Sequence, residues 1–271
     1  MATFHSVLIT GANRGIGLEF VRQFLENSDI AAQHVIATSR SVEHAFDLLE
    51  LQKKHSKLQI LKLDVTDFEA FDVFATELDK IVGEKGLTLL INNAALGNAC
   101  LTERMDSLEK VQANDFITSL VTNVAGPVLL TKALLPLLKQ SALANNQCHN
   151  GDVKGLSVTR AAVINIGSIF GSCQISATDN FYKRVRSDGY RESKAALNMT
   201  TQSMSIDLEK DGILVESIHP GTVDTRLTAK LGDQYKISTA TSVREMLNLM
   251  LALKGDHKNG FYQYDGKLLP F

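Results

Sequence analysis

Short apolar runs alternate along the chain with longer segments in which apolar residues recur at helical spacing. The short runs are apolar on both faces, which is typical of strands buried in a parallel sheet. The predicted strands are Val7–Thr10, His34–Thr38, Leu58–Leu63, Leu87–Ile91, Ala161–Ile166 and Ile213–Ile218. The predicted helices are Gly15–Glu26, Val42–Lys54, Phe68–Val82, Phe116–Gln140, Gly189–Glu209 and Ser242–Leu253. This alternation predicts an α/β fold, a doubly wound parallel sheet with helices on both faces and ligands at the carboxyl ends of its strands.

Three polar stretches interrupt the alternation: Ser141–Arg160, Gly171–Asp188 and Thr225–Thr241. We interpret the first as a surface insertion without a catalytic role. The other two follow the carboxyl ends of predicted strands, so we expect them to border the ligand crevice as substrate-side loops. The length of 271 residues fits one large α/β domain that spans the whole chain.

A glycine turn follows the first predicted strand directly and opens the first predicted helix. It reads Gly11-Ala12-Asn13-Arg14-Gly15-Ile16-Gly17. Free backbone N–H groups and the helix dipole at such a turn face an anion, which favours a dinucleotide pyrophosphate. A P-loop is excluded because no Gly-Lys-Ser/Thr ends the turn. The glycines by themselves remain compatible with an ordinary strand-helix turn.

The end of the second predicted strand discriminates between the two nicotinamide dinucleotides. An NAD site places an Asp or Glu about 20 residues past the glycines, where it accepts a hydrogen bond from the ribose 2′-hydroxyl. This chain has Thr38-Ser39-Arg40 there instead. Guanidinium groups suit phosphate geometry, so Arg40, with Arg14 on the other side, indicates the 2′-phosphate of NADP(H). The alternative is two exposed loop arginines without a ligand.

Tyr190 and Lys194 carry the strongest sign of chemistry. Residues four apart on a helix share a face, where an ammonium is expected to lower the pKa of a phenol and ready it for proton transfer. Carbonyl reduction needs such a donor, because the substrate oxygen gains negative charge as hydride reaches the carbon. A tyrosine that merely packs in a helix is the competing interpretation.

Composition narrows the class of protein. The chain is 44% hydrophobic and 21% charged with a net charge of -2, which favours neither nucleic acid nor a membrane surface. No stretch is expected to span a bilayer, and the first apolar run leaves no room for a cleavable signal. Cys100, Cys148 and Cys173 lack metal-ligand spacing and are odd in number, which indicates a reducing compartment and no metal site. The cytoplasm is the expected location.

In these motifs and their order, the chain resembles a short-chain dehydrogenase/reductase with a Rossmann-type sheet. The glycine turn matches the nucleotide loop of that family, and Asp64-Val65 matches the pair that contacts adenine. Asn92-Asn93-Ala94 matches the segment that stabilises the sheet and lines the cofactor cleft. The stretch from Pro220 and Gly221 through Val223 to Thr225 is similar to the one that embraces the nicotinamide.

The resemblance also implies roles for four residues. It places Asn123, Ser168, Tyr190 and Lys194 at the four catalytic positions of the family. Tyr190 would be the proton donor, and Lys194 would also hold the nicotinamide ribose. Ser168 would stabilise the substrate oxygen, and Asn123 would position a water that connects Lys194 to solvent.

Finer details resemble the sniffer or C-factor-like carbonyl reductases. They are Ala12-Asn13-Arg14, the run Leu135-Pro136-Leu137-Leu138-Lys139, and Tyr264-Asp265-Gly266. The resemblance implies an NADPH-dependent carbonyl reductase acting on a ketone, aldehyde or quinone, assembled as a homo-oligomer. Two alternatives stay open: an NADP-dependent hydroxysteroid or hydroxyacyl alcohol dehydrogenase, and a non-catalytic NADPH-sensing interaction protein.

Overall fold

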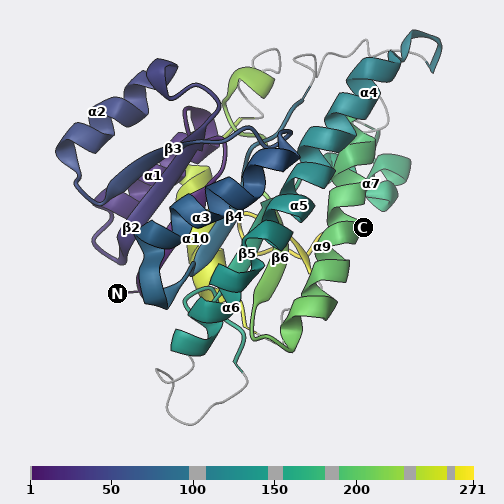
Figure 1. Cartoon of the computed structure of the whole chain (residues 1–271). Helices are drawn as coiled ribbons and strands as arrows, with labels where there is room; N and C mark the ends of the chain where they lie inside the picture. The colour runs from purple at the N-terminus through teal and green to yellow at the C-terminus, as the bar shows by residue number, and fades with distance from the viewer. Residues whose placement is uncertain (1, 98–107, 146–154, 181–188, 229–235, 255–259) are drawn as a thin grey trace.

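The centre of the molecule is a seven-stranded parallel sheet (Figure 1). The computed structural model describes residues 2–97, 108–145, 155–180, 189–228, 236–254 and 260–271. The strands, in the sheet order β3-β2-β1-β4-β5-β6-β7, are Leu58–Lys62, Ile30–Ser39, Ala2–Ile9, Leu89–Asn92, Ala162–Ile166, Leu214–His219 and Phe261–Gln263. Strand order reverses between β1 and β4, and that switch point is where sheets of this type bind ligands.

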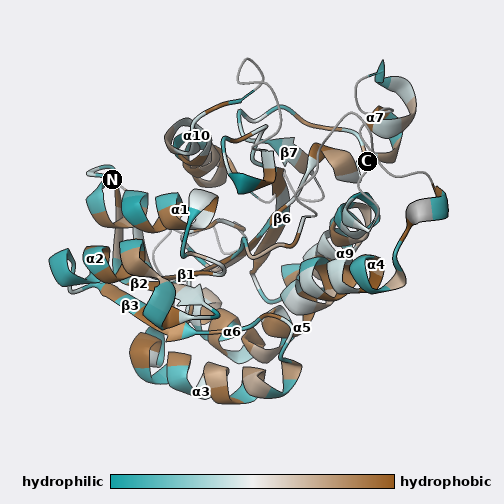
Figure 2. Ribbon diagram, turned by 90° about the horizontal axis from the view of Figure 1, so that it is seen from above, coloured by the Kyte–Doolittle hydropathy of each residue, from teal (hydrophilic) through white to brown (hydrophobic). Residues whose placement is uncertain are grey.

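Helices cover both faces of the sheet (Figure 2). They are α1 Gly15–Glu26, α2 Phe46–Lys54, α3 Phe71–Val82, α4 Ala113–Leu120, α5 Gly126–Ala133, α6 Leu135–Ala144, α7 Cys173–Thr178, α9 Tyr190–Glu209 and α10 Thr239–Ala252. The predicted doubly wound fold is therefore confirmed.

Alternation along the strands divides the core into two layers. Val7 and Ile9 of β1 join a cluster that contains Phe20 of α1 and Met246 of α10. Leu8, between them in sequence, points into the opposite cluster, with α3, α5 and α9. Both layers are apolar because helices cover both faces of the sheet, which is why the central parts of the strands, such as Val7–Ile9 of β1, are apolar on both sides.

The predicted helix Phe116–Gln140 is interrupted in the structure. A π-helical turn, Val121–Ala125, separates α4 from α5, and the chain breaks again at Leu134 before α6. Pro127 and Pro136 stand in the first turns of α5 and α6, where a residue without a backbone N–H is tolerated. Apolar spacing alone does not reveal these breaks.

One further difference concerns the same region. The stretch Ala113–Ala133 is long and apolar enough, by length and composition, to cross a membrane, contrary to the expectation from the sequence. Core helices of globular proteins meet the same criterion, and here the stretch packs on its own fold: α4 and the π turn contact α9, and α5 contacts α3. We therefore read it as part of the helical layer.

The polar stretches contain more regular structure than the sequence indicates. Helix α6 continues to Ala144, and Ser141 Oγ donates to the carbonyl of Arg160 at 3.0 Å, so the ends of the expected insertion lie together. Helix α7 lies within the second stretch, and α10 begins at Thr239 in the third. Part of each stretch lies outside the described residues, namely 146–154, 181–188 and 229–235. Cys148, in the first of these ranges, and Cys100, in the separate range 98–107, are outside the described residues as well.

The short strand β7 was not predicted from the sequence. Its three residues are too few to form an apolar run of strand length. They are a strand because they pair with the end of β6, where Ser217 lies opposite Phe261. After it, the backbone N–H of Tyr264 donates to the carbonyl of His219 at 2.8 Å. Strand β7 thus supports the end of β6, where part of the site lies.

Candidate active site

The glycine turn is packed so closely against the end of β4 that larger residues do not fit. Gly11 has a φ of +62°, and a Cβ there would lie 2.8 Å from Cα of Ala94. A Cβ on Gly17 would lie 2.5 Å from Nδ2 of Asn93. Gly15 also has a positive φ, +56°, but lies in more open space, where its nearest neighbour is Thr225. The turn therefore needs glycine for conformation and for close approach.

A hydrogen-bond network fixes the turn to β4. Oγ1 of Thr10 accepts from the backbone N–H groups of Asn93 and Ala94, both at 3.0 Å. The amide of Asn93 donates to the carbonyls of Thr10 and Gly11 at 2.8 and 3.1 Å. These bonds set the backbone of the glycine turn at the switch point of the sheet.

The start of α1 offers donors to an anion. Arg14 immediately precedes the helix, and its side chain makes no capping hydrogen bond. The first N–H groups of a helix lack intrahelical partners, so an uncapped start suits a negatively charged ligand. Ile16 and the half-buried Asn13 complete the turn, and Ile16 also lines the cavity described below. The chain's own residues thus fit a pyrophosphate.

Two exposed arginines lie in and beside this turn. Arg14 follows β1, and Arg40 follows the neighbouring strand β2. The backbone N–H of Ala12 donates to the carbonyl of Thr38 at 2.8 Å, which joins the two strand ends. Both guanidinium groups are therefore available at the same edge of the sheet for a phosphate.

Asp64 and Val65 follow β3 at that edge. Oδ1 of Asp64 accepts from the backbone N–H and the hydroxyl of Thr66, at 2.9 and 2.7 Å, which fixes the turn. Val65 is buried, and its carbonyl oxygen would lie 2.7 Å from a Cβ on Gly126. The structure places this pair at the edge where the sequence predicts the adenine end of a nucleotide.

Tyr190 and Lys194 lie on one face of α9 and are both buried. Gly189, with a φ of +80°, begins the helix against α4, because a Cβ there would lie 2.8 Å from Cα of Phe116. Nζ of Lys194 lies 5.8 Å from the centre of the Tyr190 ring and donates to the carbonyl of Ile166 at 2.8 Å. The predicted spacing thus brings both groups to the ends of β5 and β6.

Burial controls the ionisation of these groups. It raises the pKa of the Tyr190 phenol, and a hydrogen bond with Ser168 opposes the rise. It lowers the pKa of Lys194 to about 8. The expectation that Lys194 lowers the pKa of Tyr190 is not met, because the ammonium is held by the Ile166 carbonyl and desolvation dominates. The phenol consequently stays protonated, which is the form that a proton donor needs.

Asn123 lies in the π-helical turn, in contact with α9. Its Oδ1 accepts from the backbone N–H of Leu96 at 2.8 Å, and its Nδ2 donates to the Leu96 carbonyl at 2.8 Å and to Oγ of Ser193 at 2.9 Å. These bonds join α9 to the segment after β4. The side chain therefore fixes the relative position of two walls of the site.

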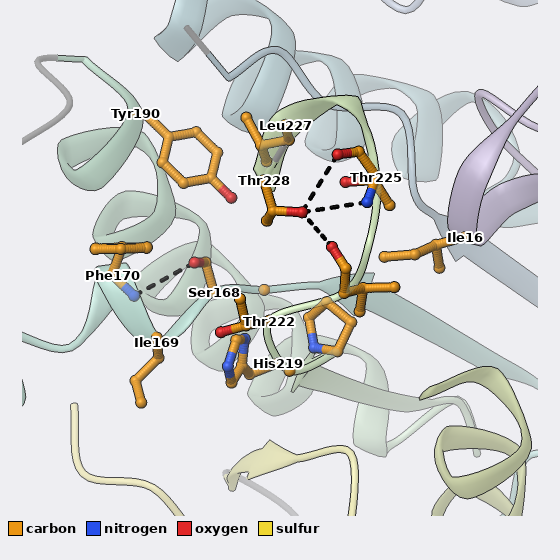
Figure 3. Close-up of a pocket in the computed structure, with 14 residues that line it drawn as sticks. Ile16, Ser168, Ile169, Phe170, Tyr190, His219, Thr222, Thr225, Leu227 and Thr228 are labelled. Atoms are coloured by element: carbon orange, nitrogen blue, oxygen red, sulfur yellow. Dashed lines mark hydrogen bonds between the residues drawn. The ribbon is translucent and has the colours of Figure 1, made fainter. Parts of the chain in front are cut away.

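A cavity opens beside these groups (Figure 3). Its walls come from the start of α1, the ends of β5 and β6, the start of α9, and the segment that follows β6. The lining residues are Ile16, Gly167, Ser168, Ile169, Phe170, Tyr190, His219, Pro220, Gly221, Thr222, Val223, Thr225, Leu227 and Thr228. Ser168 and Tyr190 thus share one cavity with the four residues predicted to embrace the nicotinamide.

His219, at the end of β6, also lines the cavity. Its ring is buried, and Nδ1 has no hydrogen-bond partner among the residues that the structure describes. Burial lowers its pKa to about 3; Lys194 acts in the same direction, and Asp265 opposes it. His219 is therefore neutral at physiological pH. Its position at the end of a strand, just before Pro220, was the available sequence signal.

The fold and the site together are those of a nicotinamide-dependent oxidoreductase: a glycine turn at the switch point, beside a buried tyrosine and lysine at the same edge. Residues 5–236 match the family described as short chain dehydrogenase. The chain belongs to this family, and the resemblance found in the sequence is confirmed.

Individual relatives cover nearly the whole chain. An uncharacterized oxidoreductase of Schizosaccharomyces pombe is 31% identical over 278 residues, which span 97% of this chain and 96% of the relative. The carbonyl reductase Sniffer of D. melanogaster is 34% identical with a TM-score of 0.86, covering 99% of this chain and 100% of that one. An NADPH-bound carbonyl reductase from chicken fatty liver is 35% identical with a TM-score of 0.89, covering 100% and 96%.

Proposed function

We propose that this protein is an NADPH-dependent carbonyl reductase in which Tyr190 protonates the substrate oxygen. The observation that carries the proposal is the shared cavity: the protonated, buried phenol lies beside Ser168 and opposite the segment Pro220–Thr225. The similarity to two carbonyl reductases supports this substrate class.

The residues that would hold NADPH are spread along the carboxyl edge of the sheet. Gly11, Gly15 and Gly17 would admit the pyrophosphate, and Arg14 and Arg40 would pair with the 2′-phosphate. Asp64, Val65, Asn93 and Ala94 would border the adenosine half. Pro220, Gly221, Val223 and Thr225 would hold the nicotinamide end. When bound, this cofactor supplies the hydride of the reduction.

Side chains of the protein would donate the proton and stabilise the developing negative charge. The Tyr190 hydroxyl would donate its proton to the substrate oxygen, and Ser168 would donate a hydrogen bond to the same oxygen. Lys194 would lend positive charge near the phenol and hold the ribose of the cofactor. Asn123 would serve by fixing α9 and, as its family position implies, by ordering a water toward Lys194.

The reaction can be tested by following NADPH absorbance with a panel of ketones, aldehydes, dicarbonyls and quinones. Tyr190→Phe is expected to lower kcat by about a thousandfold, since general acid catalysis contributes roughly 10²- to 10⁴-fold. Its affinity for NADPH should be unchanged, which controls for folding. NADPH binding by the natural protein without turnover of any compound would contradict the proposal and favour a sensor of NADPH. Turnover confined to alcohol oxidation with NADP⁺ would favour the dehydrogenase.

The cofactor preference has its own test. Arg40→Asp replaces a phosphate partner with a group that repels phosphate and accepts from a ribose hydroxyl, so the ratio of NADPH to NADH activity should fall. Lys62→Asp makes the same charge reversal at the exposed end of β3 and serves as the control for net charge. An NADPH preference unchanged by Arg40→Asp would remove Arg40 from the site.

We also propose that the protein forms a homo-oligomer through its helical layer. Ile117 of α4 and Met199 and Ile206 of α9 are apolar and exposed, and these two helices contact each other. Apolar side chains gathered in this way are suited to a subunit interface. Sedimentation that shows a monomer at micromolar concentration would contradict this assembly.

For location, we propose the reducing cytoplasm. Cys173 is a free, exposed thiol. Free exposed thiols persist where glutathione keeps them reduced. Cell fractionation against compartment markers tests this location.

A further inference from the structure

The segment after β6 is held by one side chain in particular, that of Thr228. Its hydroxyl donates to the carbonyl of Val223 at 2.5 Å and accepts from the backbone N–H of Thr225 at 3.1 Å (Figure 3). A second oxygen, the carbonyl of Thr225, lies farther away at 3.3 Å. Since a hydroxyl has one proton, the nearer Val223 carbonyl is its acceptor.

These bonds close a small ring of backbone. The N–H of Thr228 donates back to the Thr225 carbonyl at 3.1 Å, and a short 3-10 turn, Arg226–Thr228, follows Thr225. A side-chain oxygen that accepts from the N–H just before a helical turn acts as in a capping box. Thr228 is 7% exposed, so water does not readily replace its hydroxyl.

Other bonds hold the neighbouring backbone groups of the same segment. Oγ of Ser242 donates to the Pro220 carbonyl at 2.6 Å. Ile237 donates its N–H to the Thr222 carbonyl and accepts from the N–H of Asp224, both at 2.9 Å. The Val223 carbonyl lies between the anchored groups of Thr222 and Asp224, and the N–H of Thr225 follows them. The Thr228 hydroxyl binds both of these remaining groups.

We propose that Thr228 is a positioning residue for the nicotinamide end of the cofactor. It fixes Val223 and Thr225, which both line the cavity, before the ligand arrives. The role rests on the proposed function, because Val223 and Thr225 matter here as the nicotinamide contacts. Preorganisation of this kind raises affinity by removing the cost of ordering a loop on binding.

The experiment separates this role from a general structural one by using two ligands. NADPH carries the nicotinamide, whereas 2′,5′-ADP carries the adenosine and both of its phosphates but no nicotinamide. Thr228→Val keeps the shape and removes the hydroxyl, leaving a buried N–H and carbonyl without partners. We expect its Kd for NADPH to rise about tenfold or more, while its Kd for 2′,5′-ADP stays within about twofold of the natural protein.

Two variants serve as controls. Thr228→Ser keeps the hydroxyl and should bind NADPH as the natural protein does. Thr76→Val removes a threonine hydroxyl that donates to a helix carbonyl, that of Asp72, far along the chain on α3, and should change neither Kd. Calorimetric binding and thermal unfolding are measured for every variant.

Several results of these measurements would contradict the proposal. Equal weakening of both ligands in Thr228→Val, no weakening of either, or unfolding of this variant and of Thr228→Ala even with 2′,5′-ADP would overturn the positioning role. Failure of the natural protein to bind NADPH would instead refute the proposed function, so the two failures are distinguishable.

Discussion

The two ends of the ligand-binding edge are built differently. At the end of β1 and β4, Thr10 and Asn93 make short hydrogen bonds to backbone, and Gly11 and Gly17 leave no space for a methyl group. At the end of β5 and β6, Tyr190 and His219 line a cavity, and Nζ of Lys194 lies 5.8 Å from the centre of the Tyr190 ring. The pKa values of all three residues are shifted chiefly by burial.

The difference teaches how one sheet edge serves two tasks. Binding a pyrophosphate needs fixed backbone donors, which close packing provides. Proton transfer needs groups with shifted pKa values, which desolvation provides. Substitutions at the first end should therefore act mainly by disturbing close packing. Substitutions at the second end should act mainly on proton transfer and ionisation.

After Tyr190→Phe, the largest effect is expected from Ser168→Ala, at the cavity end. Loss of one donor to a developing oxyanion costs about 10²- to 10³-fold in kcat. The bond that Ser168 Oγ accepts from the N–H of Phe170 is long, 3.3 Å, so the fold should tolerate the change. Steady-state kinetics at saturating NADPH measure it, with Ser168→Thr as the variant that keeps a hydroxyl. A kcat equal to that of the natural protein would assign Ser168 to structure alone.

The next effect is expected at the rigid end, from Gly11→Ala. Its Cβ would press on Ala94 in addition to straining a left-handed backbone. Gly83→Ala is the matched control, since Gly83 has a similar φ of +56° but no neighbour within 4 Å. Urea denaturation should show Gly11→Ala about 2 kcal/mol less stable than Gly83→Ala. Equal losses would show that strain, not close packing, explains the glycine.

Acid should destabilise the protein through the cavity end. The pKa of His219 is lowered from 6.5 to about 3, so the unfolded chain binds the proton more readily across that window. Stability is then lost as pH falls from 6.5 toward 3, by about 2 kcal/mol between pH 6.5 and pH 5. In His219→Gln, which has no ring to protonate, unfolding should depend less on pH. An unchanged pH dependence would show that His219 does not set it.

The smallest effect concerns alkaline pH. Lys194 loses its charge above a pKa of about 8, whereas the raised pKa of Tyr190 keeps the phenol protonated. If the ammonium assists catalysis, kcat/KM for reduction should fall about tenfold per pH unit above pH 8. Lys194→Arg retains its charge and should lose this alkaline limb. A natural enzyme with a flat profile up to pH 10 would argue against a role for the charge.

Much of the site could be predicted because its residues follow strand ends. Ser168 and the Pro220–Thr225 segment were found in this way, and the structure brings them to one cavity with Tyr190. Tyr190 and Lys194 were found by their helical spacing, which places both on one face of α9. The role of Thr228 was not predicted, because its hydrogen bonds depend on a turn that no local sequence pattern indicates. The low pKa of His219 could not be predicted, because it results from burial by several elements.

The sequence by itself determined the parallel sheet, the glycine turn and the shared face of Tyr190 and Lys194, since each of these depends on spacing within a few residues. Only the tertiary structure decided that β7 pairs with β6 and that Asn123 lies in a π-helical turn. It likewise decided that the Lys194 ammonium donates a hydrogen bond to the Ile166 carbonyl. It also decided the direction of each pKa shift. These depend on partners and burial supplied by residues far away in the chain, and local periodicity carries no information about them.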